Sequence, residues 1–125
     1  MQNTIIYGHH MSSGAPMFAN LVNYKSQGFW QTNRYIEVYT LDGIYTYEIF
    51  AAYEASPYYY DGCYFTTDFS TEGLFTRFLR GIEQNNSIET GVSVTEKDRI
   101  LTLSTCSDNG KKRFAVHGKL VSIEN

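Results

Sequence analysis

Residues 34–53 read RYIEVYTLDGIYTYEIFAAY and predict a β-hairpin. In the first half, β-branched residues alternate with Tyr and Glu, which is the period-two pattern of a half-buried strand. Asp42-Gly43 follows, and this dipeptide suits the positive φ angles of a two-residue hairpin turn. From Ile44 the alternation resumes and continues to Tyr53. This segment therefore predicts strands over 34–41 and 44–53, joined by a tight turn at Asp42-Gly43.

Four other segments predict strands. Thr4–Tyr7 is a short apolar run ended by a glycine, and Val92–Val94 is short and strand-like. Arg99–Thr105 and Arg113–Ile123 are longer strands. Residues 106–112, which contain an Asp, an Asn and a Gly, supply good turn chemistry between them. The strands together favour a mostly antiparallel β domain.

Two segments change to helical spacing. Met17–Tyr24 predicts a short amphipathic helix that Gly28 stops, with two aromatic residues in the core beyond it. Ser70–Gln84 predicts a longer helix with Ser70 or Thr71 as its N-cap. Its apolar stripe is expected in the core: Leu74, Phe75, Phe78, Leu79 and Ile82. The fold class is therefore mainly β with two helical insertions.

Composition excludes several classes of protein. With 125 residues the chain is expected to be one domain, 1–125. Ten basic residues against 13 acidic ones give a net charge of −3, which argues against nucleic-acid binding. We find no membrane anchor and no signal peptide in the sequence. The two cysteines, Cys63 and Cys106, make no metal framework and at most one disulfide.

Three reactive residue types lie at predicted strand ends. Cys106 ends one strand, Arg113 opens the next, and His9 follows the first strand by two residues. If the strands around 106–112 pair, Cys106 and Arg113 meet at one edge of the sheet. A thiolate there attacks a carbonyl, an imidazolium protonates the leaving amine, and a guanidinium steadies the oxyanion. The alternative is a buried, inert cysteine.

The sequence around these residues resembles the sortases. TLSTC at 102–106 is similar to the TLxTC signature, YGHHM at 7–11 to the segment with the sortase histidine, and KRFAV at 112–116 to the arginine segment. The aromatic residues after the histidine and the helix before the cysteine strand point to class B. The resemblance implies a sortase-like antiparallel β-barrel that lacks its N-terminal anchor, helices and first strands.

The resemblance also implies a reaction and its residues. Cys106 would attack the Thr carbonyl of a sorting motif to form a thioacyl-enzyme, His9 would protonate the departing amine, and Arg113 would hold the substrate or the oxyanion. With ordinary pKa values, thiolate and imidazolium coexist at pH 7 in only about 1% of molecules. Five further residues are expected to bind the sorting peptide: Ser87, Ile88, Thr90, Ser104 and Thr105.

The implied partners are a sorting-signal peptide of a surface protein and a peptidoglycan amine acceptor, with no cofactor or metal. The full-length family member acts at the extracellular face of the Gram-positive membrane. Absent first strands would leave an unpaired barrel edge, through which the chain is expected to form a homo-oligomer. Two alternatives stay open: an inactive sortase-like fragment that binds peptide or self-associates, and a generic cysteine hydrolase.

Other residues with chemical potential have structural interpretations. His10 is expected to be a loop residue next to His9, and His117 a packed, hydrogen-bonded histidine within the last strand. Cys63 is expected to be a spare thiol. The tyrosines at 58–60 are expected to pack rather than to stack on a ligand.

Overall fold

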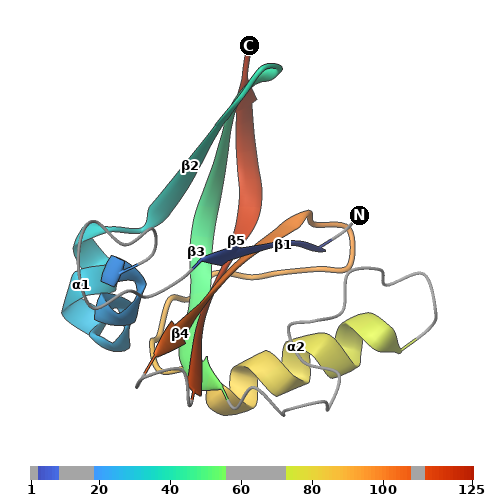
Figure 1. Ribbon diagram of the computed structural model, residues 1–125. Coiled ribbons are helices and arrows are strands. Elements are labelled where there is room, and N and C mark those ends of the chain that lie inside the picture. Colours follow the sequence, from blue (N-terminus) through green and yellow to red (C-terminus); the bar gives the residue numbers. More distant parts are fainter. Residues whose placement is uncertain (1–2, 9–18, 56–72, 108–111) are drawn as a thin grey trace.

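The computed structural model describes residues 3–8, 19–55, 73–107 and 112–125 (Figure 1). Within these ranges the chain forms five strands, one 3₁₀ helix and two α-helices. In chain order these elements are β1 (Asn3–Gly8), η1 (Ala19–Lys25), α1 (Gln27–Thr32), β2 (Tyr35–Thr40), β3 (Gly43–Ala55), α2 (Leu74–Asn85), β4 (Ile100–Ser107) and β5 (Lys112–Glu124).

The five strands form a single sheet in the order β1-β4-β5-β3-β2. Three of the four pairings are antiparallel, which confirms the predicted mainly β, mostly antiparallel fold. The exception is β1, which runs parallel to β4. A parallel pair needs a long crossover connection, and residues 9–99 provide it. Figure 1 shows that the strand direction turns from β1 and β4 to β2 and the upper part of β3, so the described strands form a twisted, curled sheet with β1 and β2 at its edges.

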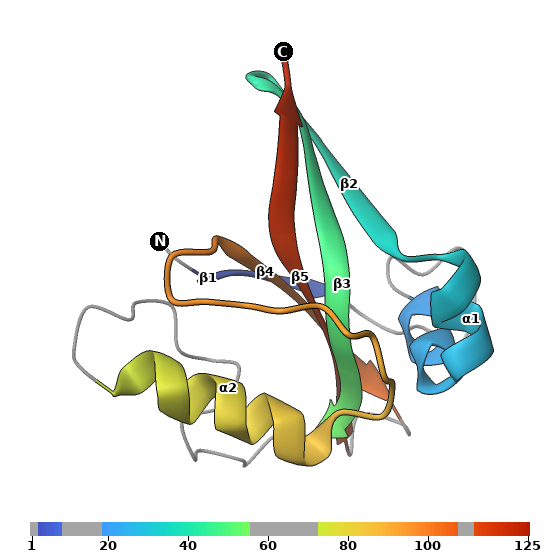
Figure 2. The same cartoon turned by 180° about the vertical axis from the view of Figure 1, so that it is seen from behind.

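Each face of the sheet has its own core. Alternation along β5 sends Phe114 and Val116 into the cluster that contains η1 and α1, and Ala115 into the cluster under α2. Figures 1 and 2 show α1 and α2 on opposite sides of the sheet. A bulge in β3 puts both Phe50 and Ala51 into the α2-side cluster. The sheet is therefore a central layer between two small helical layers.

The first hairpin forms with its turn one residue earlier than predicted. Thr40 pairs with Gly43, so the two turn residues are Leu41 and Asp42, not Asp42 and Gly43. The Thr40 hydroxyl accepts a hydrogen bond from the Asp42 backbone N–H at 3.1 Å, which stabilises this turn. Gly43 is the first residue of β3, with a φ of 140° that side chains rarely adopt. A Cβ there would lie 2.2 Å from the Glu124 carbonyl oxygen. The glycine is therefore used for a close approach of two strands.

The predicted first helix is also displaced. The 3₁₀ helix η1 ends at Lys25, and Gly28 does not stop a helix but lies inside α1. Ser26 caps α1, because its hydroxyl accepts from the Phe29 N–H at 3.2 Å. Trp30 is buried, as expected, and its indole N–H donates to the Ile49 carbonyl at 3.2 Å. The serine cap restarts the helix where the sequence pattern alone indicated an end.

The second predicted helix is confirmed as α2, with a later start. Its N-cap is Gly73, with a φ of 89° and no side-chain cap, while the predicted caps Ser70 and Thr71 lie outside the described residues. Phe78 and Ile82 are buried under it, as the stripe predicted. The prediction of a strand at Val92–Val94 is wrong, because these residues have no strand pairing. Instead, the Val92 N–H donates to the hydroxyl of Thr90, which in turn donates to the Phe50 carbonyl of β3.

Beyond β2, side chains and loop backbone cover the open edge of β3. The Ile49 N–H donates to the Arg34 carbonyl at 2.8 Å, and the Thr90 hydroxyl donates to the Phe50 carbonyl at 3.1 Å. Asn86 Oδ1 accepts from the Ala52 N–H at 2.9 Å. These bonds satisfy backbone groups that would otherwise need another strand.

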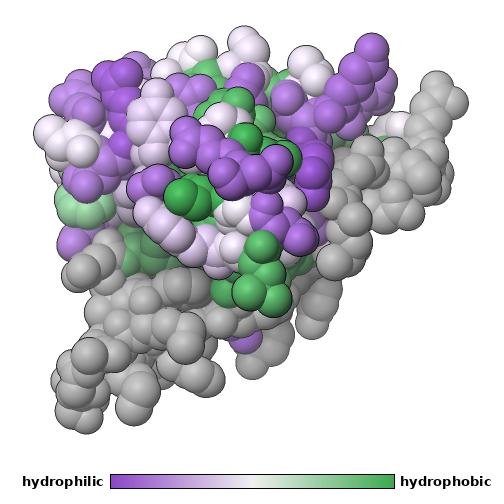
Figure 3. All heavy atoms as spheres, turned by 90° about the horizontal axis from the view of Figure 1, so that it is seen from above, coloured by the Kyte–Doolittle hydropathy of each residue, from purple (hydrophilic) through white to green (hydrophobic). Residues whose placement is uncertain are grey.

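The exposed large apolar side chains lie in β2, its turn and the end of β5: Tyr35, Tyr39, Leu41, Val121 and Ile123. Figure 3 views the molecule from above and shows apolar groups interspersed with polar ones among the described residues on that face.

We predict that Gly43→Ala lowers the free energy of unfolding by about 3 kcal/mol, because the new Cβ meets backbone in a strained conformation. Urea unfolding measures the change. Gly91→Ala is the matched control, since Gly91 has a φ of 69° but open space around it, and should lose only about 1 kcal/mol. Equal losses in the two variants would contradict the close approach to Glu124.

Candidate active site

Cys106 and Arg113 lie opposite each other in the register of β4 and β5. The pairing runs one step further, to Ser107 and Lys112, and residues 108–111 then connect the two strands outside the described part of the chain. Cα atoms of directly opposed residues in an antiparallel pair are about 4.5–5.5 Å apart. The expected meeting of these two positions at one edge of the sheet is therefore present in the backbone, and their catalytic roles stay predictions.

The strand that leads to the predicted histidine ends at the same edge. β1 runs parallel to β4, and its last residue, Gly8, is paired with Thr105. Neighbouring parallel strands end at the same edge of a sheet, so β1 ends next to the level of Cys106. His9 itself lies outside the described residues, as do His10, Cys63 and the tyrosines at 58–60.

The residues before Cys106 are buried. Ser104 and Thr105, both expected to contact the sorting peptide, have no exposed surface. Within the described part of the chain, the Thr105 hydroxyl has no hydrogen-bond partner. A buried hydroxyl without a partner is uncommon and costly. In this structure a peptide would reach these two hydroxyls only after they are uncovered.

A chain of buried side-chain hydrogen bonds crosses four strands beside this edge. The Tyr53 hydroxyl of β3 hydrogen-bonds to His117 Nε2 at 2.8 Å, and His117 Nδ1 hydrogen-bonds to the Thr102 hydroxyl at 2.8 Å. That hydroxyl donates to Asn3 Oδ1 at 2.7 Å. Because a hydroxyl has one proton, Nδ1 must donate to Thr102, so Nε2 accepts from Tyr53. The histidine is therefore the neutral Nδ1–H tautomer.

The surroundings of His117 keep it neutral. The ring is fully buried, stacked on Phe50 at a centroid distance of 5.9 Å and met edge-on by Phe78 at 5.8 Å. Burial lowers the pKa of His117 to about 3, because the charged form loses its hydration. The prediction of a packed, hydrogen-bonded histidine is confirmed. The hydrogen bond between Thr102 and Asn3, which continues this network, had no signal in the sequence.

The predicted peptide-binding stretch after α2 packs in the core and hydrogen-bonds to β3. Ile88 is buried in the core on the η1 side, and the Ser87 N–H donates to the Ala52 carbonyl at 2.8 Å. Asn86 braces the stretch, since its Oδ1 accepts from the Ile88 N–H at 3.2 Å and its Nδ2 donates to the Ile88 carbonyl at 2.6 Å. Peptide binding by Ser87, Ile88 and Thr90 stays a prediction.

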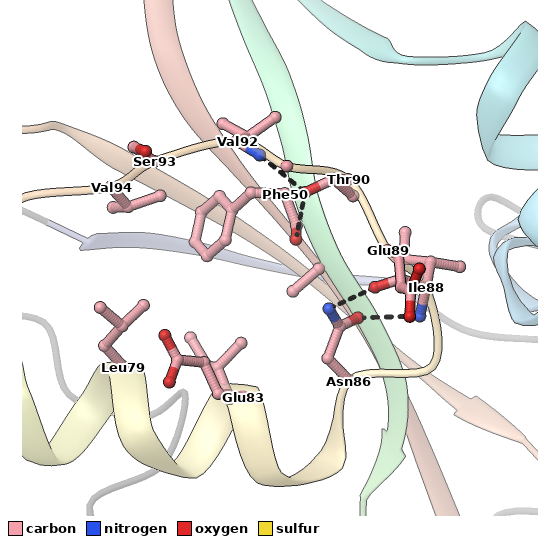
Figure 4. A pocket seen from close by; sticks show the side chains of 13 residues that line it. Phe50, Leu79, Glu83, Asn86, Ile88, Glu89, Thr90, Val92, Ser93 and Val94 are labelled. Atoms are coloured by element: carbon pink, nitrogen blue, oxygen red, sulfur yellow. Dashed lines mark hydrogen bonds between the residues drawn. The ribbon is translucent and has the colours of Figure 1, made fainter.

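Two of these residues line a cavity of about 520 Å³ that the sequence did not predict. Figure 4 shows it between the C-terminal half of α2 and the segment 88–94, with the Phe50 ring on one side and Leu79 and Glu83 on the helix side. The lining is mixed, because aliphatic and aromatic groups alternate with the polar side chains of Asn86, Glu89 and Thr90. Clefts of this size and character are typical of ligand pockets.

In the described ranges we find no group of three or more His, Cys, Asp or Glu side chains that could hold a metal ion. The helices of the same ranges include none that is long and apolar enough to cross a membrane.

Comparison with known proteins gives consistent matches. A family model for the sortase domain matches residues 1–121. Sortase B of Staphylococcus aureus is 36% identical over 124 residues, which cover 97% of this chain and 49% of that protein. The Staphylococcus aureus sortase B–substrate complex superposes with a TM-score of 0.85 at 34% identity, covering 98% of this chain and 56% of that one. A sortase B crystal structure in complex with triglycine gives a TM-score of 0.84 at 36% identity, covering 98% and 57%. The chain thus spans about half the length of these relatives.

The neutral His117 predicts a specific acid sensitivity. Its pKa is about 3 in the folded state and near 6.5 when unfolded, so between these values the unfolded chain binds more protons. The contribution of His117 to the free energy of unfolding is therefore complete above pH 6.5 and falls as the pH drops toward 3, by up to about 1.4 kcal/mol per pH unit.

Urea unfolding of the wild type and of His117→Asn between pH 4.5 and 7.5 measures this contribution. The variant should be less stable at pH 7 and should have a shallower pH dependence, by about one proton. Other titrating groups contribute to the pH dependence of both proteins, so their contributions cancel when the two slopes are compared. Identical slopes for the two proteins would contradict a neutral, buried His117.

Proposed function

The chain belongs to the sortase family, and we propose that it carries the catalytic residues of a class B sortase-type cysteine transpeptidase. In this proposal it cleaves a C-terminal sorting motif of a surface protein and joins the new end to a peptidoglycan amine. The relatives support these partner classes, since one was solved with its substrate and another with triglycine. The full-length protein would act at the outer face of the Gram-positive membrane.

One observation carries the proposal beyond family membership. β1 and β4 end side by side, and Arg113, the second residue of β5, lies directly opposite Cys106. Three segments far apart in the sequence thus contribute to one edge of a hydrogen-bonded sheet. A rigid scaffold of this kind holds reacting groups close together, which lowers the entropic cost of bringing them into reactive geometry.

The chemistry proceeds in two halves. The Cys106 thiolate attacks the carbonyl carbon of the motif's Thr, the peptide C–N bond breaks, and the leaving amine takes a proton from the His9 imidazolium. A thioester on Cys106 remains. An incoming amine then gives a proton to His9 and attacks the thioester, so that an amide forms and the thiolate is released. Arg113 donates hydrogen bonds to the oxyanion formed in each half.

The cavity beside α2 supports peptide binding along the same sheet. Phe50 lies five residues along β3 from Ala55, which is paired with Arg113, a separation of roughly 16 Å at the usual strand rise. An extended motif of five residues has about this length. We propose that the peptide runs from Cys106 toward Ser87, Ile88 and Thr90, and that Ser104 and Thr105 contact it once their burial is relieved.

A second candidate function is peptide binding or self-association without turnover. It is supported by β1, which among the described strands has a hydrogen-bonded neighbour on one edge only. An unpaired strand edge can pair with a second copy of the chain. This candidate predicts a dimer that binds sorting peptides but leaves them intact, whereas the leading proposal requires cleavage.

We predict that the chain cleaves a quenched sorting peptide and that Cys106→Ala abolishes this cleavage. Adding triglycine should convert part of the product to the amide-linked form, which mass spectrometry detects. Arg113→Ala should lower kcat/KM about 100-fold, as expected for the loss of one oxyanion donor. The kcat/KM of Arg113→Lys should lie between those of the wild type and Arg113→Ala, because lysine keeps the charge but not the planar guanidinium.

Circular dichroism of each variant controls for folding. Cleavage by Cys106→Ala would overturn the proposed nucleophile. Cleavage with no amide product would favour a cysteine hydrolase, and binding without any cleavage would favour the second candidate.

A further inference from the structure

The register of β1 on β4 is not fixed by a tight turn or by the apolar pattern alone. β1 has six residues and joins β4 only through the long crossover. Ile6 packs on the η1-side core, which fixes the face that β1 presents. A shift by two residues keeps the same faces, because side chains alternate with a period of two. Another interaction must therefore select one register.

Asn3 supplies a polar group that only one register satisfies. Its side chain has no exposed surface, and its Oδ1 accepts the single proton of Thr102 at 2.7 Å. With its proton given to Asn3, Thr102 accepts from His117 Nδ1–H, so its hydroxyl is satisfied on both sides. In the observed register, β1 thus supplies the acceptor for the Thr102 proton.

A two-residue slip would remove that acceptor. If Ile5 took the place of Asn3, the buried Thr102 hydroxyl would face an aliphatic side chain with its proton unpaired, which is costly. Gly8 would then lie opposite Leu103 instead of Thr105, and the end of β1 would move by roughly 7 Å along the sheet. The wrong register would thus move the end of β1 away from the level of Cys106.

We infer that the Asn3–Thr102 hydrogen bond, oriented by His117 and Tyr53, locks the β1–β4 register and thereby sets the level at which β1 ends beside Thr105 and Cys106. A single buried polar pair is a known way to specify register. These four are positioning residues, and their importance for catalysis rests on the proposed function. The register lock itself does not.

Methyl-labelled NMR tests the lock without any need for activity. The wild type should show a contact between the methyl groups of Ile6 and Leu103, which are register partners. Asn3→Leu and Thr102→Val keep side-chain size but remove the acceptor or the hydroxyl. Each should give a second set of Ile5 and Ile6 signals, at about 10% of the first or more, and weaken the contact. Thr102→Ser keeps the hydroxyl, and Thr4→Ala changes an exposed neighbour, so both should keep one set.

Peptide cleavage supplies the second readout. Asn3→Leu and Thr102→Val should lower kcat/KM about tenfold or more per folded molecule, since small misplacements of reacting groups are costly. Thr102→Ser, which keeps the hydroxyl, should have a kcat/KM close to that of the wild type. Ile36→Val, which weakens the core on the η1 side, controls for stability alone and should keep the wild-type kcat/KM.

A single set of β1 signals with the wild-type Ile6–Leu103 contact in both Asn3→Leu and Thr102→Val would overturn the lock. Absence of cleavage in the wild type, with the NMR changes as expected, would overturn the proposed function and leave the lock supported.

Discussion

The pairing of β5 with strands on both of its sides is the constraint on which the rest of the structure depends. β5 is paired with β3 along most of its length and with β4 from Lys112 to Lys119. It thereby divides the apolar residues into two cores, with Phe114 on one face and Ala115 on the other. The same strand carries Arg113 near its start and the buried His117 further along, so one backbone ladder fixes both the candidate site and the polar network beside it.

The candidate site depends on this ladder because pairing between strands fixes the positions of its segments. The β4 strand reaches Cys106 at a level that the β5 register sets, and β1 is in turn fixed on β4. The open part of the β3 edge is closed by Asn86 and Thr90, which keeps the segment after α2 close to the sheet and forms the cavity there. Backbone hydrogen bonds thus position Cys106 and Arg113, and side-chain hydrogen bonds position the segment that lines the cavity.

The sequence predicted the elements with strong periodicity and the motifs, and it missed features that depend on distant contacts. Alternation over 34–53 predicted the first hairpin, but its turn lies one residue earlier, and the close approach of Gly43 to Glu124 has no local signature. The same holds for the Ser26 cap, which restarts a helix near the expected stop at Gly28. The TLSTC motif indicated the family. Its first threonine, Thr102, donates a hydrogen bond to Asn3, 99 positions away, and this pair becomes visible only once β1 and β4 are aligned. Peptide-binding roles for Ser104 and Thr105 followed from the motif, whereas their burial follows from the sheet.

Trapping of the acyl-enzyme tests the central claim most directly. The wild-type chain would be mixed with a sorting peptide without any amine, quenched in acid, and analysed by intact mass and by peptide mapping. The account predicts an added mass equal to the acyl part of the peptide, located on Cys106 and removed when triglycine is supplied before the quench. An adduct on Cys63, or an adduct on Cys106 that triglycine does not discharge, would contradict a transpeptidase centred on the edge where β1, β4 and β5 meet.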